Sequence, residues 1–425
     1  MDELITFYRN QFTEEEQREI EKLKDPNWKS PMGDMPIKEA TTFEMQLYAR
    51  GWNKYDPLYN DEAYAKTTRY GGMIAFPGYR HPQPMAMLPR VFGFPVMDKE
   101  TFYVGDAYDH EIQFFAPIYA GDTFTVGQQK NDLVDQTPVE GSTVRTLIMV
   151  NEQPMYNQRG ELVAKSILRW PQILMKAKDP NSDLERRRME AFEVHKHDEY
   201  RHPIHKYTPE DYERMKKLWA EEKVRGAETL YWEDVDIGDE PTPVCEPPLT
   251  ALELCRRHAH EIVMEADIRQ SLTTGERMMI YAKGTDENGH YISDHHFIGT
   301  NGRASLYNFV GRNFVTRLLT NWCGDNGFVS KVGWRFVNDR KPEVQQDPFP
   351  EDFYRPSVLH KVPYMKGRFL NTHGQGFDAM IVRGYVYSKY KNENGAFVDL
   401  ACWCEDFDGN ICQECDCTVM LPTKE

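Results

Sequence analysis

The fold is decided by two stretches with the same plan, TLIMVNEQPMYNQRGELVAKSILRWP over residues 146–171 and VDLACWCEDFDGNICQECDCTVMLP over residues 398–422. Each is an apolar stretch, a turn region with Asn and Gly, and a second apolar stretch, which predicts an antiparallel hairpin. Similar polar segments precede them, VGQQKNDL in the first copy and VYSKYKNENG in the second. The sequence therefore predicts two copies of one β-rich unit.

A strong helix candidate lies before the second hairpin. Apolar side chains recur there at three- and four-residue spacing, at Leu306, Phe309, Val310, Phe314, Val315, Leu318, Leu319 and Trp322. They form one stripe about five turns long, and Gly324 follows as a helix stop. In the first copy, Gly71–Ala75 leads into a weaker candidate at Met85, Met87, Leu88 and Val91.

A long apolar helix wrapped by an antiparallel sheet, present twice, predicts an α+β double hotdog. The two sheets are expected to join edge to edge, because free strand edges would otherwise promote aggregation. Residues 1–177 are predicted to form the first unit and residues 229–425 the second. Residues 178–228 are dense in charge and predict a helical connector.

Composition excludes several classes of protein. The formal net charge of −16 disfavours nucleic-acid binding, because such a surface repels a phosphate backbone. No run of 18 apolar residues is present, so a membrane span is not expected. The first 20 residues lack the pattern of a secretory signal, and eight Cys are too few for a disulfide scaffold. A cytoplasmic location is therefore expected.

Four segments in the same order resemble the MaoC-like family, the (R)-specific enoyl-CoA hydratases and 3-hydroxyacyl-CoA dehydratases, in its fused two-hotdog form. They are DPLYNDEAYAKTTRYGGMIAFPGY (56–79), HEIQFFAPIYAGDTFTV (110–126), YWEDVDIGDE (231–240) and YNFVGRNFVTRLLTNWCGDNGFV (307–329). The resemblance implies a double hotdog and a hydro-lyase that acts on acyl-CoA thioesters.

The first copy departs from the family pattern at its catalytic residues. The family carries an Asp, a spacer, Asn-Pro, an apolar residue and His, where this chain has Lys54, Asp56-Pro57, Leu58 and Tyr59. Lys54 is no carboxylate base, and a tyrosine with a pKa near 10 replaces His poorly. The first unit is therefore expected to shape the acyl pocket through Asp56 and Tyr59. Gly71 and Gly72 are expected to offer N–H groups at a helix start to a thioester oxyanion, or simply to allow a tight turn.

The second copy carries residues that suit the missing chemistry. Asp294, His295 and His296 combine imidazole and carboxylate just before the long helix, and are predicted to be the acid–base residues. Asn301, Gly302 and Arg303 follow and are predicted to bind substrate. The alternative is that His295 and His296 are a histidine pair without a catalytic function. Five other histidines lie in charged segments that are expected to be exposed: His110, His195, His197, His202 and His205.

Two further residue groups leave alternatives open. The hairpin at Asp408-Gly409 places Cys402 opposite Cys415, which predicts buried thiols on paired strands rather than a zinc site. Several basic residues are candidates for the coenzyme A phosphates, none assigned individually: Arg69, Arg80, Arg303, Arg312, Arg335, Arg340 and Lys341.

The sequence thus predicts an acyl-CoA hydratase or dehydratase that needs no metal or other cofactor. Its expected partners are its acyl-CoA substrate and further copies of the chain, in a homo-oligomer such as a homodimer. One alternative is a non-catalytic acyl-CoA-binding subunit that completes a partner's site. A hotdog thioesterase is disfavoured, because such enzymes place a carboxylate on the central helix and Leu306–Trp322 contains none.

Overall fold

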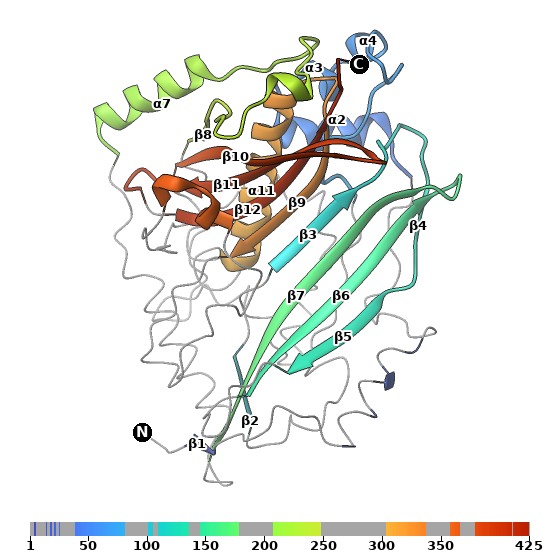
Figure 1. Ribbon diagram of the computed structural model, residues 1–425, viewed down its shortest axis with the longest axis vertical. Helices are drawn as coiled ribbons and strands as arrows, with labels where there is room; N and C mark the ends of the chain where they lie inside the picture. The colour runs from blue at the N-terminus through green and yellow to red at the C-terminus, as the bar shows by residue number, and fades with distance from the viewer. Residues whose placement is uncertain are drawn as a thin grey trace, which may run out of the picture.

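The computed structural model describes residues 39–80, 101–104, 109–135, 145–177, 207–247, 303–336, 358–365 and 379–424 apart from Asn410, with Leu4–Ile5 and five single residues between Glu14 and Asp25. In this part of the chain, 12 strands form one antiparallel sheet (Figure 1). The strand order along its main path is β4-β6-β7-β3-β9-β12-β11-β10-β8. Strands β1 and β2 pair with β7, and β5 pairs with β6.

The first unit contributes seven of these strands. They are β1 (Leu4–Ile5), β2 (Thr101–Val104), β3 (Asp109–Phe114), β4 (Phe124–Val126), β5 (Lys130–Asp135), β6 (Arg145–Asn157) and β7 (Leu162–Ala177). The second contributes β8 (Val244–Glu246), β9 (Phe328–Phe336), β10 (Met380–Asn392), β11 (Gly395–Glu405) and β12 (Ile411–Leu421). The predicted hairpins are β6–β7 and β11–β12, and both are confirmed.

The two halves meet where β3 pairs with β9, from Asp109 opposite Arg335 to Gln113 opposite Lys331. Outward from this ladder, each half presents its hairpin in the same order, β7 then β6 on one side and β12 then β11 on the other. The strand order is therefore symmetric about the β3–β9 ladder, which we call the seam. The double hotdog and its edge-to-edge junction are confirmed.

The long apolar helix is confirmed as α11 (Arg303–Cys323), which lies against the strands of the second half (Figure 1). Phe314, Val315, Leu318 and Leu319 are fully buried against the sheet. Gly324 ends the helix with φ +66°, a conformation that suits glycine, and its N–H donates to Thr320 O. The equivalent candidate of the first half, Met85–Val91, lies outside the described residues.

The cysteine hairpin has the predicted register, with Cys402 opposite Cys415. Cys402, Cys404, Cys415 and Cys417 are all buried in the core that includes α11. A bulge after Cys404 shifts the pairing near the turn. Among the described residues, no group of three or more His, Cys, Asp or Glu is arranged to hold a metal ion.

Shorter helices lie toward the C-terminal end of α11 (Figure 1). They are α2 (Thr42–Trp52), α3 (Pro57–Asn60), α4 (Glu62–Ala65) and α7 (Pro209–Glu221). Of the 3-10 turns, η1 (Trp232–Asp234) contacts β11, whereas η4 (Val358–Lys361) and η5 (Pro363–Met365) pack in a separate apolar cluster with residues of β11 and β12. Trp52 packs edge-on against Phe314, at 5.6 Å between ring centroids. Helix α7 begins with a capping box in which Thr208 and Asp211 satisfy each other's backbone N–H groups.

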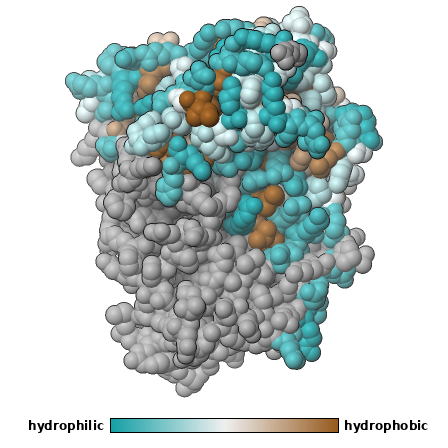
Figure 2. All heavy atoms as spheres, in the orientation of Figure 1, coloured by the Kyte–Doolittle hydropathy of each residue, from teal (hydrophilic) through white to brown (hydrophobic). Residues whose placement is uncertain are grey.

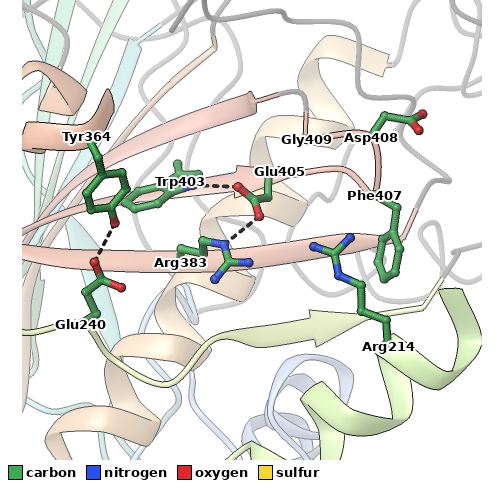
Figure 3. Close-up of a pocket in the computed structure, with 9 residues that line it drawn as sticks. All are labelled: Arg214, Glu240, Tyr364, Arg383, Trp403, Glu405, Phe407, Asp408 and Gly409. Atoms are coloured by element: carbon green, nitrogen blue, oxygen red, sulfur yellow. Dashed lines mark hydrogen bonds and ion pairs between the residues drawn. The ribbon is translucent and has the colours of Figure 1, made fainter. Parts of the chain in front are cut away.

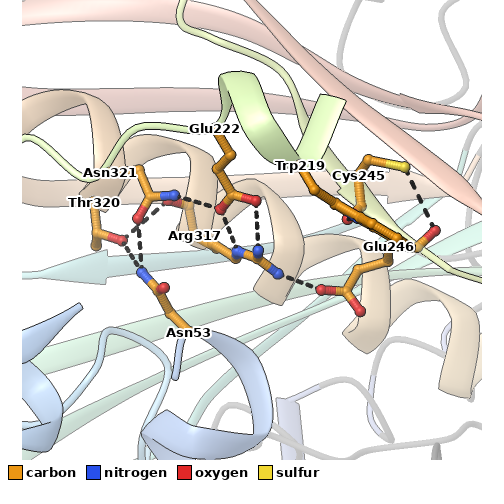
Figure 4. Close-up of polar contacts among 8 residues, drawn as sticks. All are labelled: Asn53, Trp219, Glu222, Cys245, Glu246, Arg317, Thr320 and Asn321. Carbon is orange, nitrogen blue, oxygen red and sulfur yellow. Dashed lines mark hydrogen bonds and ion pairs between the residues drawn. The ribbon is translucent and has the colours of Figure 1, made fainter. Parts of the chain in front are cut away.

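The connector is fastened to α11 by a buried ion cluster around Arg317 (Figure 4). Its guanidinium donates from Nε and Nη2 to Glu222 at 2.8 and 2.6 Å, and from Nη1 to Glu246. Asn321 also donates to Glu222, at 2.8 Å, and Asn53 at the end of α2 donates to Asn321, at 2.9 Å. The cluster therefore ties α2, the end of α7 and β8 to one face of α11.

On the face shown in Figure 2, the described surface is predominantly polar, and its apolar residues are scattered rather than gathered into one patch. Phe43, Tyr55 and Ile237 are the most exposed large apolar residues of the described part. Within that same part, no helix has the length and apolar character needed to cross a membrane.

Candidate functional site

An apolar pocket lies at one end of the seam, where both halves contribute to its wall. Its lining residues are Tyr59, Tyr70, Ile74–Tyr79, Phe114, Ala116–Ile118, Val163 and Ala164 from the first half, and Cys323 and Gly327–Val329 from the second. The rings of Tyr59 and Phe76 meet edge-on at 5.3 Å inside it. The pocket is narrow, with a volume of about 30 Å³.

Beside this pocket, α3 buries a carboxyl group. Asp56 is the N-cap of α3, and its Oδ1 accepts from Leu58 N at 3.0 Å. The residue is 3% exposed. Burial raises the pKa of Asp56 to about 7, the Leu58 N–H opposes the rise, and the charge of Asp325 adds to it. Asp56 is therefore a carboxyl group that changes protonation near neutral pH.

Asp325 comes to this point from the other half, directly after the end of α11. It is buried, its N–H donates to Gly226 O at 2.9 Å, and Oδ2 accepts from the Tyr64 hydroxyl at 2.7 Å. Burial raises the pKa of Tyr64 to about 12, and the hydrogen bond to Asp325 adds to the rise. Two acidic side chains from the two halves thus lie within electrostatic reach of each other, and among the described residues neither forms an ion pair with a cation.

Tyr59 and Cys323 line the pocket, and both lie within electrostatic reach of Asp56. Burial, and next the charge of Asp56, raise the pKa of Tyr59 well above its usual value, so its hydroxyl stays protonated. That hydroxyl has no hydrogen-bond partner among the described residues. Burial and the charge of Asp56 also raise the pKa of the Cys323 thiol to about 12, so Cys323 is not a thiolate nucleophile at neutral pH.

The binding of a thioester oxyanion by Gly71 and Gly72 stays a prediction, although neither glycine lies at a helix start among the described residues. Both lie in a bend, and no helix begins between Gly71 and Arg80. Gly71 has φ +65°, and its N–H already donates to Thr68 O at 3.0 Å. Neither glycine lines the pocket. Gly71 therefore fits the alternative expectation, that the glycine allows a tight turn.

His110 is buried, so the expectation that it is exposed is wrong. It is 2% exposed, and its ring lies 4.1 Å from that of Trp334. The Arg312 guanidinium lies 5.0 Å from the same indole ring. Charged neighbours in the sequence suggested a surface strand, but β3 pairs on both edges, with β7 and β9, and is therefore interior.

A second cavity, of about 460 Å³, lies on the face of the sheet turned away from α11 (Figure 3). It is lined mainly by charged and aromatic residues: Arg214, Glu240, Tyr364, Arg383, Trp403, Glu405, Phe407, Asp408 and Gly409. Arg383 donates to Glu405 at 2.7 Å, and Tyr364 donates to Glu240 at 2.8 Å. Because Arg383 with Glu405 and Tyr364 with Glu240 satisfy each other there, we place the candidate site at the apolar pocket, which we call the seam pocket.

Asp294, His295, His296, Asn301 and Gly302 lie outside the described residues, so their role as catalytic or substrate-binding residues stays a prediction. Arg303 is the first residue of α11, and only its backbone is described. Among the predicted residues, the structure brings Asp56 and Tyr59 together beside the pocket. Sequence reasoning missed Asp325, Tyr64 and Cys323, because only the folded chain brings α3 and α4 close to the residues at the end of α11.

Comparison with known proteins bears on the same stretch. Residues 38–166 match the family model described as the FAS1-like, dehydratase domain region. The resemblance to the MaoC-like dehydratases is confirmed. This stretch, which contains α3, the pocket residues Ile74–Tyr79 and His110, supports a hydratase or dehydratase kind of function.

Solved structures similar to the chain include a MaoC-like dehydratase, 14% identical, with a TM-score of 0.46 over 92% of this chain and 97% of that one. A putative MaoC domain protein dehydratase from Chloroflexus aurantiacus J-10-fl is 11% identical, with a TM-score of 0.43 over 91% and 93%. A conserved hypothetical protein from Mycobacterium tuberculosis, described as a double hotdog, is 11% identical, with a TM-score of 0.38 over 91% and 94%. No curated protein matches the chain.

Proposed function

We propose that the chain catalyses the reversible addition of water to an enoyl thioester of coenzyme A, and that the seam pocket receives the acyl group. One observation carries the proposal. A buried carboxyl that titrates near neutral pH, Asp56, lies behind an apolar pocket in the stretch that matches the dehydratase model. In this proposal the enzyme uses no metal or redox cofactor, and it works as a homo-oligomer.

The reaction needs a base, an acid and hydrogen-bond donors for an enolate-like oxygen. A carboxyl group with a pKa of about 7 can accept and donate a proton at neutral pH, which suits Asp56 to acid–base work. Tyr59 keeps its proton and can donate a hydrogen bond to the thioester carbonyl. Asp294 with His295 or His296 is the second acid–base candidate.

The narrow pocket supports a short acyl group. Tyr59, Tyr70 and Tyr79 contribute bulky rings to its lining, and its volume is about 30 Å³. A long acyl chain would have to displace these rings, which costs packing energy. We therefore expect kcat/KM to fall as the acyl chain is lengthened.

The test is incubation of the purified protein with enoyl-CoA and 3-hydroxyacyl-CoA thioesters of increasing length in deuterated water. Mass spectrometry then follows exchange at Cα. Asp56→Asn, Asp294→Asn, His295→Ala and His296→Ala separate the two acid–base candidates, and Glu62→Gln on exposed α4 is the matched control. Loss of about 100-fold or more identifies the acid–base group. If no thioester exchanges deuterium, the proposed activity is wrong.

A non-catalytic acyl-CoA-binding subunit is the second candidate, favoured by Lys54 and Tyr59 at the positions of the family's Asp and His. The same panel of thioesters distinguishes the two candidate functions, because a non-catalytic subunit should bind the thioesters without deuterium exchange at Cα. A thioesterase remains disfavoured, since α11 carries no Asp or Glu.

A further inference from the structure

Arg69 is a fixed cation next to the seam pocket. Its guanidinium lies 4.8 Å from the ring centroid of Tyr70. Nη2 donates to the Tyr70 hydroxyl at 2.7 Å and to Gly327 O at 3.3 Å. Tyr70 and Gly327 both line the pocket, whereas Arg69 itself is exposed. The guanidinium is therefore held at the rim, and its position is set by residues of both halves.

Arg69 differs from most arginines of the described part in having no carboxylate partner. Arg80 pairs with Glu44, Arg159 with Asp122, and Arg383 with Glu405. Arg69 has two neutral oxygen partners, which occupy Nη2 and leave the donors of Nε and Nη1 for a ligand. On a chain with a net charge of −16, a positioned cation without a counter-ion suits an anionic ligand.

We propose that Arg69 binds the phosphate of a phosphopantetheine thioester whose acyl end enters the seam pocket. This inference rests on the proposed function. A guanidinium already stacked on an aromatic ring loses little conformational freedom when it binds, so the contact contributes more to affinity. The phosphate is common to coenzyme A thioesters and to thioesters on a carrier protein, and both sources are tested below.

The other basic residues predicted to meet phosphate are less suited where they are described. The Arg80 side chain is 8% exposed and lies 2.9 Å from Glu44. Arg312 is 1% exposed and lies over Trp334. The side chains of Arg303 and Arg335, and all of Arg340 and Lys341, lie outside the described residues.

The experiment compares a short enoyl-CoA with the same enoyl thioester of pantetheine, which lacks both the pantetheine phosphate and the nucleotide. We expect Arg69→Ala to lower kcat/KM about 10- to 100-fold with the coenzyme A thioester and less than about twofold with the pantetheine thioester. Arg69→Lys keeps the charge and should recover part of the loss. Arg50→Ala, which removes an exposed cation from α2, is the matched control and should leave both values unchanged.

Two results would overturn the proposal. Equal loss with both thioesters would mean that Arg69 acts through Tyr70 on the shape of the pocket, and no loss with either would place the phosphate elsewhere. The same variants on an acyl carrier protein thioester identify the phosphate. Loss with both sources supports the shared phosphate, and loss with coenzyme A alone overturns it in favour of the nucleotide phosphates.

A failure of the proposed function can be distinguished from a failure of the inference about Arg69. If the wild-type protein turns over no thioester, calorimetric titration with coenzyme A, and with pantetheine as the control, still tests Arg69. Coenzyme A should then bind at least about 10-fold more weakly to Arg69→Ala than to the wild-type protein. Equal binding, including no binding to either protein, would contradict the inference.

Discussion

Two groups of buried carboxylates flank the last turns of α11, and they differ in their partners. Glu222 and Glu246 share the guanidinium of Arg317, which is a side chain 6% exposed. Asp56 and Asp325 lie near each other on the side of the pocket, and Asp325 accepts from a neutral tyrosine hydroxyl. Paired carboxylates hold the connector in place, whereas an acid pair without a cation costs stability and keeps a proton available near pH 7.

The largest expected effect comes from removing the shared cation. Arg317→Met should lower the free energy of unfolding by about 3–5 kcal/mol, because two buried carboxylates lose their partner. Chemical denaturation at pH 7 measures this loss. Lys216→Met, which breaks an exposed pair with Glu213, should change it by less than about 1 kcal/mol. Equal effects would remove the distinction between a buried cluster and a surface pair.

Asp56→Asn should raise the free energy of unfolding, and the size of the increase should depend on pH. The folded protein keeps a proton on Asp56 up to a pKa of about 7, whereas the ordinary pKa of an aspartate side chain is 3.8. The wild-type protein therefore loses stability as pH rises between about 4 and 7, and above pH 7 the full penalty is present. Asn can still cap α3. The free energy of unfolding of the variant should exceed that of the wild-type protein by at most about 4 kcal/mol at pH 8 and by little at pH 4.

Denaturation midpoints measured across that pH range, for wild-type protein and variant in parallel, check this expectation. A constant difference between the two proteins would mean that the pKa of Asp56 is the same in the folded and unfolded states. The comparison between paired and unpaired acids would then fail.

A smaller effect is expected where the seam is packed tightly without any charge change. A Cβ on Gly78, whose φ is +100°, would lie 2.8 Å from the Tyr48 hydroxyl. Gly78→Ala should therefore cost about 1–3 kcal/mol, and the cost should be the same at pH 5 and pH 8. Thermal unfolding at both values tests this. A pH-dependent cost would indicate that the packing at Gly78 and the acid pair are linked.

Local patterns predicted the elements of the fold well. The stripe from Leu306 to Trp322 predicted α11, and the Asp408-Gly409 turn predicted the pairing of Cys402 with Cys415. Both depend on residues close in sequence. His110 was assigned to the surface because its neighbours are charged, and only the pairing of β3 with β9 makes it interior.

The candidate site was predictable only in its first-half members. Asp56 and Tyr59 stand out because they replace residues of a family motif, yet nothing near them in sequence indicates that Asp325 lies beside them. That neighbour is supplied by the ends of α3 and α11, which are far apart along the chain. Sequence patterns also say little about burial, and burial is what raises the pKa of Asp56.

The most direct test of the central claim, that the unpaired carboxyl beside the seam pocket does acid–base work, is the pH dependence of deuterium exchange at Cα of a short enoyl-CoA. The account predicts that exchange by the wild-type protein changes with an apparent pKa near 7. It also predicts that Asp56→Asn, folded and at least as stable, exchanges about 100-fold more slowly at pH 7. Exchange by Asp56→Asn at the wild-type rate and with the same pH profile would contradict it.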